Sequence, residues 1–120
     1  MSKYGNIQSA GCSYGFSHRS KLEYAVCQLI WLREKAGELK HIQHECNIHL
    51  TKARVLYIPD FKCETRDGLL FIEAKGYEAA RWPTIKKLWK HYGPGPLEIW
   101  KGMHRRPILD ETIIPVGGDE

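Results

Sequence analysis

Two short apolar runs that each end in charged residues constrain this chain more than any other feature. The first run ends in Pro59-Asp60 and the second in Glu73-Ala74-Lys75, with a turn signal at Arg66-Asp67-Gly68 between them. This pattern predicts two strands joined by a turn, with charged groups at matching positions of the strands. Two carboxylates and one ammonium group are poor material for a core. They suit a site for a divalent cation and a phosphate group instead.

The elements around these strands follow from hydrophobic periodicity and capping residues. Ser20 and Glu23 have the spacing of a capping box, which predicts a helix that begins there and ends before Gly37. Period-2 alternation over 41–50 predicts a half-buried strand. Pro83 suits the first turn of a second helix. In chain order, we expect a helix at 20–36, strands at 41–50, 55–63 and 69–75, a helix at 83–92 and a strand at 97–100.

This order predicts an α/β domain with a small mixed four-stranded sheet flanked by helices. The continuous apolar run at 69–72 indicates a central strand, buried on both faces. The length of 120 residues suits one domain. We expect a flexible arm at 1–17, rich in Gly, Ser and Tyr, a core domain at 18–102, and a weakly patterned extension at 103–120 with an acidic end.

Composition narrows the setting and the partners. No apolar run approaches the roughly 20 residues of a membrane span, and the chain starts without a hydrophobic signal region, so we expect a cytoplasmic protein without a membrane partner. The four cysteines are widely spaced, which argues against a disulfide framework. The net charge is +4, and basic residues concentrate in 76–106. A basic body suits nucleic acid, although a solvated charged face explains the charge equally well.

The charged strand ends match the needs of phosphodiester hydrolysis. Mg²⁺ prefers oxygen ligands and accepts one or two carboxylates, which Asp60 and Glu73 would supply, with the backbone carbonyl of Ala74 as a third ligand. Lys75 follows Glu73 by two residues, so both point to one face of a strand. There Lys75 would orient or deprotonate the attacking water, or stabilise charge on the phosphorane. An ordinary cross-strand ion pair and a turn-forming Pro-Asp are the alternative.

Glu23 and Gln43 are further candidates near this site. Glu23 lies on the first helix, where a role in the metal shell and a role in the capping box are equally supported. Gln43 lies on the polar face of the strand at 41–50, where it either approaches the site or faces solvent. A zinc site is not expected, because strand alternation puts His41 on the face opposite to His44 and Cys46.

Basic and aromatic residues flank these candidates. Lysines on the second helix form a basic face that would hold backbone phosphates. Tyr77 and Trp82, near the start of that helix, are candidates for stacking on an exposed base. The candidate DNA-binding residues are His18, Arg19, Arg81, Lys86, Lys87 and Lys90.

Pro59-Asp60 followed by Glu73-Ala74-Lys75 resembles the signature of the PD-(D/E)XK nuclease superfamily. The predicted order of elements resembles the core of that superfamily over residues 18–102. Residues 18–23, 57–61 and 72–76 are similar to phage endonuclease I-type Holliday-junction resolvases and to small phage and prophage nucleases. The resemblance implies a restriction-endonuclease-like core and a Mg²⁺-dependent endodeoxyribonuclease, with Mn²⁺ as a substitute. It also implies that Asp60, Glu73 and Glu23 form the metal site and that Lys75 is catalytic.

The same resemblance implies cleavage of branched DNA, including Holliday-junction resolution during DNA recombination. A homodimer would supply the two active sites that such a substrate needs, in the bacterial host cytoplasm if the protein is phage-encoded. The acidic tail and the lack of a second basic domain depart from the resolvases, so junction specificity stays open. A nicking or restriction-type endonuclease is one alternative. A catalytically inactive nuclease fold that binds DNA or a protein is another.

Overall fold

The computed structural model describes Tyr14 and residues 20–76, 78–103 and 106–117, apart from the side chain of Met103. The expected arm at 1–17 therefore lies outside the described residues, except for Tyr14. In chain order the elements are α2 (Lys21–Lys35), β1 (Lys40–His44), β2 (Ile48–His49), β3 (Leu56–Tyr57), β4 (Phe61–Thr65), β5 (Gly68–Ala74), α3 (Trp82–Tyr92), β6 (Leu97–Met103) and β7 (Arg106–Ile113).

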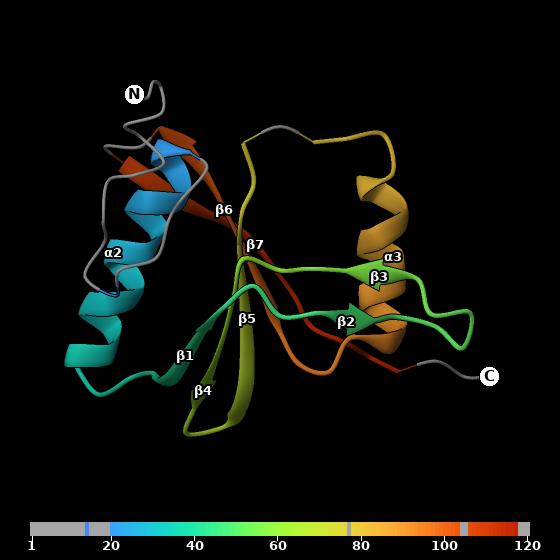
Figure 1. The fold of residues 1–120 in the computed structure, drawn as a ribbon, viewed down its shortest axis with the longest axis horizontal. Coiled ribbons are helices and arrows are strands. Elements are labelled where there is room, and N and C mark those ends of the chain that lie inside the picture. Colours follow the sequence, from blue (N-terminus) through green and yellow to red (C-terminus); the bar gives the residue numbers. More distant parts are fainter. Residues whose placement is uncertain (1–13, 15–19, 77, 104–105, 118–120) are drawn as a thin grey trace.

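Five of these strands form one mixed sheet in the order β1-β4-β5-β6-β7. β5 and β6 are parallel and are connected through α3, whereas the other neighbours are antiparallel. β2 and β3 form a separate antiparallel pair. In Figure 1, α2 and α3 lie on either side of the sheet, and the β2–β3 pair extends across α3. The prediction of a mixed α/β fold is confirmed at this level, and the predicted central strand is β5.

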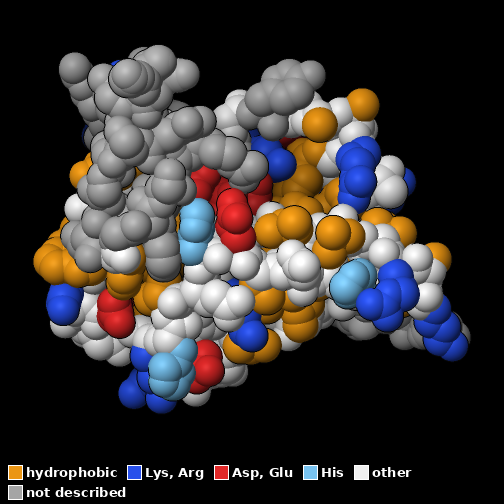
Figure 2. All heavy atoms as spheres, viewed as in Figure 1, with side chains coloured by type: hydrophobic (Ala, Val, Ile, Leu, Met, Phe, Trp, Pro, Cys, Tyr) orange, Lys and Arg blue, Asp and Glu red, His pale blue; other side chains and the backbone are white. Residues whose placement is uncertain are grey.

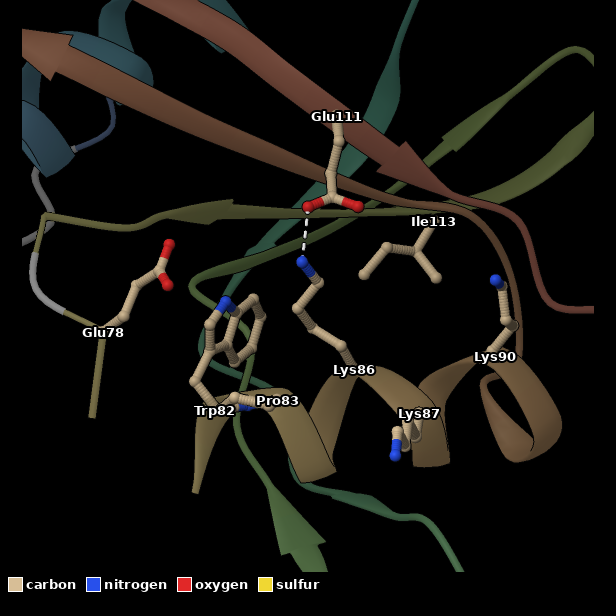
Figure 3. Close-up of a pocket in the computed structure, with 8 residues that line it drawn as sticks. All are labelled: Glu78, Trp82, Pro83, Lys86, Lys87, Lys90, Glu111 and Ile113. Atoms are coloured by element: carbon tan, nitrogen blue, oxygen red, sulfur yellow. Dashed lines mark hydrogen bonds and ion pairs between the residues drawn. The ribbon is translucent and has the colours of Figure 1, made fainter. Parts of the chain in front are cut away.

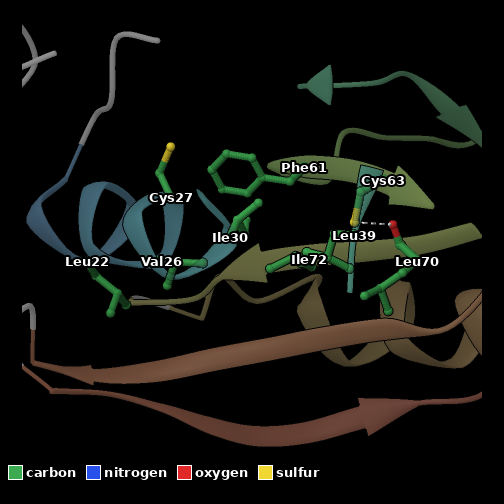
Figure 4. Packing of buried hydrophobic residues seen from close by; sticks show 9 residues of the cluster. All are labelled: Leu22, Val26, Cys27, Ile30, Leu39, Phe61, Cys63, Leu70 and Ile72. Atoms are coloured by element: carbon green, nitrogen blue, oxygen red, sulfur yellow. Dashed lines mark hydrogen bonds between the residues drawn. The ribbon is translucent and has the colours of Figure 1, made fainter. Parts of the chain in front are cut away.

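Alternation along β5 divides the core into two clusters. Leu70 and Ile72 point toward α2 and pack with Val26, Ile30 and Phe61 (Figure 4). One half of the core thus lies between α2 and the sheet face that carries Leu70 and Ile72, because residues two apart on a strand share a face.

The second cluster forms on the α3 side of the sheet. Phe71 points this way and packs edge-on against Trp89, with ring centroids 5.1 Å apart. Leu50 is also buried here, with Leu97 and Ile99. The short β2–β3 pair therefore shares a core with α3.

Capping residues act at α2 as the sequence predicts. The Ser20 side chain accepts a hydrogen bond from the backbone N–H of Glu23 at 3.0 Å. Ala36 caps the other end, and Gly37 follows with φ of +82°. Glycine adopts this left-handed conformation without a steric penalty, so the helix ends where a glycine is available.

The prediction of one strand at 41–50 is wrong, because β1 ends at His44 and β2 begins only at Ile48. Glu45 has φ of +62°, and its N–H donates to the Asp60 carbonyl. A left-handed residue interrupts strand alternation. Consequently Ile42 packs with the α2 cluster and Ile48 with the α3 cluster, although simple alternation puts them on one face.

The predicted strand at 55–63 is likewise two strands. β3 ends at Tyr57 and pairs with β2, whereas β4 begins at Phe61 and pairs with β5. Pro59 lies in the break, where its missing N–H costs no ladder hydrogen bond.

The sheet has five strands where four are expected, because the extension at 103–120 contributes β7. This strand pairs with β6 from Met103↔Arg106 to Leu97↔Ile113, with an irregularity between Ile99 and Trp100. That irregularity accounts for the weak alternation in the sequence. No helix in the described ranges is long and apolar enough to cross a membrane.

Candidate active site

The candidate site forms where the start of β4 meets the end of β5. The antiparallel register pairs Phe61 with Ile72. Asp60 immediately precedes Phe61, and Glu73 immediately follows Ile72, so the two acids lie at one edge of the hairpin. Figure 2 shows acidic side chains meeting near the middle of this face, beside a hollow lined with hydrophobic side chains.

Hydrogen bonds tie Asp60 to the Glu73 carboxylate and to the backbone of Ala74. The backbone N–H of Asp60 donates to Glu73 Oε1 at 3.2 Å. The backbone N–H of Ala74 donates to Asp60 Oδ2 at 2.8 Å. Both acids are almost fully buried, with 4% and 8% of their surfaces exposed. These bonds stabilise the two carboxylates in a buried position that would otherwise be unfavourable.

Tyr57 is a third residue of the candidate site, and the sequence did not predict it as a site residue. Its hydroxyl donates to Glu73 Oε1 at 2.8 Å. Burial, together with the Glu73 carboxylate beside it, raises the pKa of Tyr57 far above its ordinary value. The hydroxyl therefore stays protonated and remains a donor. Burial also raises the pKa of Glu73, although Lys75, Tyr57 and the Asp60 N–H oppose that shift.

Lys75 brings a positive charge to the same edge. Its Nζ lies 3.4 Å from Glu73 Oε2 and 4.1 Å from the centre of the Trp82 ring. An ammonium group over an indole face is stabilised by a cation–π interaction. Trp82 is almost fully buried, so it supports Lys75. Trp82 also lines a hollow beside the site, so stacking of a base on it stays a prediction, and Tyr77 lies outside the described residues.

Glu23 lies on α2 and contacts His44 of β1. Glu23 Oε2 lies 2.8 Å from His44 Nε2, and the His44 ring packs against Phe61 with centroids 5.3 Å apart. Glu23 is buried. Its backbone makes the capping bond to Ser20, while its carboxylate is directed to His44. The bond to Ser20 thus uses the backbone N–H of Glu23, and the Glu23 carboxylate contacts His44.

The structure does not bring Gln43 to the candidate site. It is exposed and pairs with Lys62 across the sheet. His44, one residue later, is the β1 side chain that reaches a candidate acid. The sequence pattern put His44 on the same face as Cys46 and did not predict its contact with Glu23.

The predicted basic face on α3 is present. Lys86, Lys87 and Lys90 project from α3, and Lys86 reaches Glu111 on β7 at 2.7 Å (Figure 3). Lys87 and Lys90 are exposed. Arg81, just before the helix, donates to the Leu56 carbonyl at 2.8 Å. These groups flank the Trp82 side of the site; His18 and Arg19 lie outside the described residues.

No protein-family model, curated protein or solved structure matches this chain. The chemistry of the site is therefore argued from its own residues.

The oxygen-rich acid pair suits a hard divalent cation. Within the described ranges, no three His, Cys, Asp or Glu side chains converge as a ready metal cluster. Mg²⁺ is bound through one or two carboxylates and keeps water and substrate oxygens as its other ligands. Burial disfavours the charged form of Glu73, and a nearby cation would stabilise it. The donor set thus fits Mg²⁺.

Proposed function

We propose that this chain is a metal-dependent endonuclease that hydrolyses DNA phosphodiester bonds at Asp60, Glu73 and Lys75. The hydrogen bonds that tie Asp60 to the Glu73 carboxylate and to the Ala74 backbone are the observation that carries the proposal. They bring two buried carboxylates, one just before β4 and one on β5, to one edge. Lys75 adds a cation within 3.4 Å of Glu73. Buried acids beside a lysine are typical of catalytic sites and uncommon in a packed core.

The carboxylates of Asp60 and Glu73, with the backbone carbonyl of Ala74, would hold Mg²⁺, and Mn²⁺ could replace it. Glu23 is a fourth candidate through its buried carboxylate. When bound, the metal ion activates water and neutralises charge on the phosphate.

The chain's own residues would position the reactants. Water attacks the phosphorus and the bond to the 3′ oxygen breaks, which leaves a 5′-phosphate and a 3′-hydroxyl. Lys75 would stabilise negative charge on the phosphoryl oxygens during this step. The hydroxyl of Tyr57 would keep Glu73 in place through its 2.8 Å hydrogen bond, and the Trp82 ring would hold Lys75.

The basic residues of α3 would hold the DNA backbone. Lys87 and Lys90 are exposed, and Lys86 lines the same pocket as both. Arg81, just before the helix, lines the hollow that also contains Lys75. Phosphate contacts of this kind position a duplex without reading its sequence. This arrangement supports selection by DNA structure, including branched junctions, in a restriction-endonuclease-like core. A homodimer would place two such sites on a two-fold junction.

Cleavage of matched DNA substrates tests this proposal. Labelled duplex, four-way junction, flap and single-stranded DNA are incubated with Mg²⁺ and either the wild type or Lys75→Ala. Lys40→Ala is the control, because Lys40 is exposed on β1. We expect paired nicks in the junction, lost in Lys75→Ala and kept in Lys40→Ala. If all three proteins leave every substrate intact, the chain is a binding module and the proposal is wrong.

A further inference from the structure

A hollow of about 430 Å³ opens directly beside the proposed active site. Tyr57 and Lys75 form part of its wall, and both also contact Glu73. A group bound in this hollow would therefore adjoin the carboxylates, and its volume suits one small ligand.

The walls combine hydrophobic and aromatic side chains with two cations and one acid, Glu45. Leu56 and Ile58 are 40% and 43% exposed, and Ile85 is buried on the helix side. Lys75 and Arg81 supply the positive charges. The Arg81 guanidinium is fixed by its bond to the Leu56 carbonyl.

We propose that this hollow receives one unpaired nucleobase of the DNA, next to the phosphate that is cut. A nucleotide joins a flat apolar ring to an anionic phosphate, which matches an apolar hollow flanked by cations. Aliphatic contact with Leu56 and Ile58 and stacking on the Arg81 guanidinium would hold the base, as proteins hold unstacked bases elsewhere. This inference rests on the proposed nuclease function and adds a substrate feature to it.

An unpaired base explains selection of branched DNA without sequence reading. Extruding a base from a duplex costs a few kcal/mol, and the cost is smallest where the base is already unpaired. Flaps offer such bases in their single strand, next to the branch point. The hollow between α3 and β7 is a weaker candidate, because Glu111 neutralises Lys86 there and Glu78 adds a further acid (Figure 3).

Fluorescence of 2-aminopurine reports on a base that leaves its stack. Single-stranded and flap DNA carrying this base at successive positions are mixed with the wild type, with Ca²⁺ replacing Mg²⁺ to suppress cleavage. We expect a fluorescence rise at one position. Ile58→Ala should abolish that rise and weaken DNA binding about fivefold, which corresponds to the loss of about one base contact. Ile108→Ala is the matched control, because Ile108 is exposed on β7, outside the hollow.

The outcomes separate this inference from the nuclease proposal. If Mg²⁺ supports cleavage but Ile58→Ala changes neither fluorescence nor binding, the base site is wrong and the nuclease stands. If the hollow binds a protein side chain instead of a base, we expect that same observation, in which Ile58→Ala changes neither fluorescence nor DNA binding. If the rise depends on Ile58 but no DNA is cut with Mg²⁺, the base site stands and the nuclease proposal fails. Absence of DNA binding by the wild type overturns both.

Discussion

Asp60 and Glu73 fix each other's positions through their backbones and side chains. The N–H of Asp60 donates to the Glu73 carboxylate, and the Asp60 carboxylate accepts from the N–H of Ala74, one residue after Glu73. Each acid thus depends on the strand that carries the other. A change in the β4–β5 register would separate both acids, so the hairpin itself specifies the candidate site.

Removal of the Tyr57 hydroxyl should impair the site without disturbing the fold. Tyr57→Phe keeps the ring that packs near Trp82 and Trp89 and removes the donor to Glu73. A hydrogen bond to a charged group contributes about 1.5–3 kcal/mol, so we expect cleavage about 10- to 100-fold slower. The rate and the Mg²⁺ concentration for half-maximal rate are measured together. An unchanged rate in a folded variant would show that Tyr57 does not position Glu73.

Ser20 and Glu23 allow the helix cap to be separated from the active site. Ser20→Ala removes the side chain that accepts from the Glu23 N–H, and loss of such a cap costs about 1 kcal/mol. We expect lower stability in urea with unchanged cleavage. Glu23→Gln keeps that backbone bond and changes the carboxylate, so we expect slower cleavage and a higher Mg²⁺ requirement. Equal cleavage by wild type and Glu23→Gln would restrict Glu23 to a structural role.

Gly93 tests the packing of α3 against the sheet. A methyl group added at Gly93 would lie 2.6 Å from atoms of the Trp89 indole. That ring is fully buried and donates to the Gly95 carbonyl at 2.8 Å. Overpacking of this kind costs about 1–3 kcal/mol, so Gly93→Ala should lower the free energy of unfolding by that amount. Gly76→Ala is the control, because no atom of the described residues, apart from Gly76 and its chain neighbours, lies within 4 Å of the added methyl group. Equal stability of the two variants would contradict this packing.

Cys63 should make stability fall at alkaline pH. Burial raises the pKa of the Cys63 thiol to about 12, so the folded state favours the neutral thiol. That contribution is complete below the unfolded pKa of about 8.5 and is lost as the pH rises toward the folded value. Relative to Cys63→Ala, the wild type should lose up to about 1.4 kcal/mol per pH unit above about pH 9. Parallel stability curves for both proteins in urea from pH 7 to 10.5 would contradict this expectation.

Local signals in the sequence predicted much of the fold. Ser20 and Gly37 mark the ends of α2, and Pro83 lies in the first turn of α3. The apolar run at 69–72 indicated the central strand. Each of these features depends on residues that are close together in the sequence, so periodicity and capping rules predict it.

Other features depend on contacts between distant residues. Glu45 adopts a left-handed conformation and donates to the Asp60 carbonyl, a contact that no alternation pattern reports. The tyrosine three residues before Asp60 reaches Glu73 only because β3 folds across α3 toward the end of β5. The sequence therefore predicted that Asp60, Glu73 and Lys75 lie close together, but not the contacts that Tyr57 and Trp82 make with them.

The metal dependence of cleavage by wild type, Asp60→Asn and Asp67→Asn shows whether Asp60 holds a metal ion that the reaction needs. Asp67 is exposed in the hairpin turn, so it receives the same substitution away from the site. With protein in excess over labelled four-way junction, we expect wild type and Asp67→Asn to cut with Mg²⁺ and to be inactive with a chelator. Asp60→Asn should be slower by about 100-fold or more, which corresponds to about 2.7 kcal/mol of lost transition-state stabilisation. Equal rates for all three proteins, or cleavage that persists in the chelator, would contradict the account.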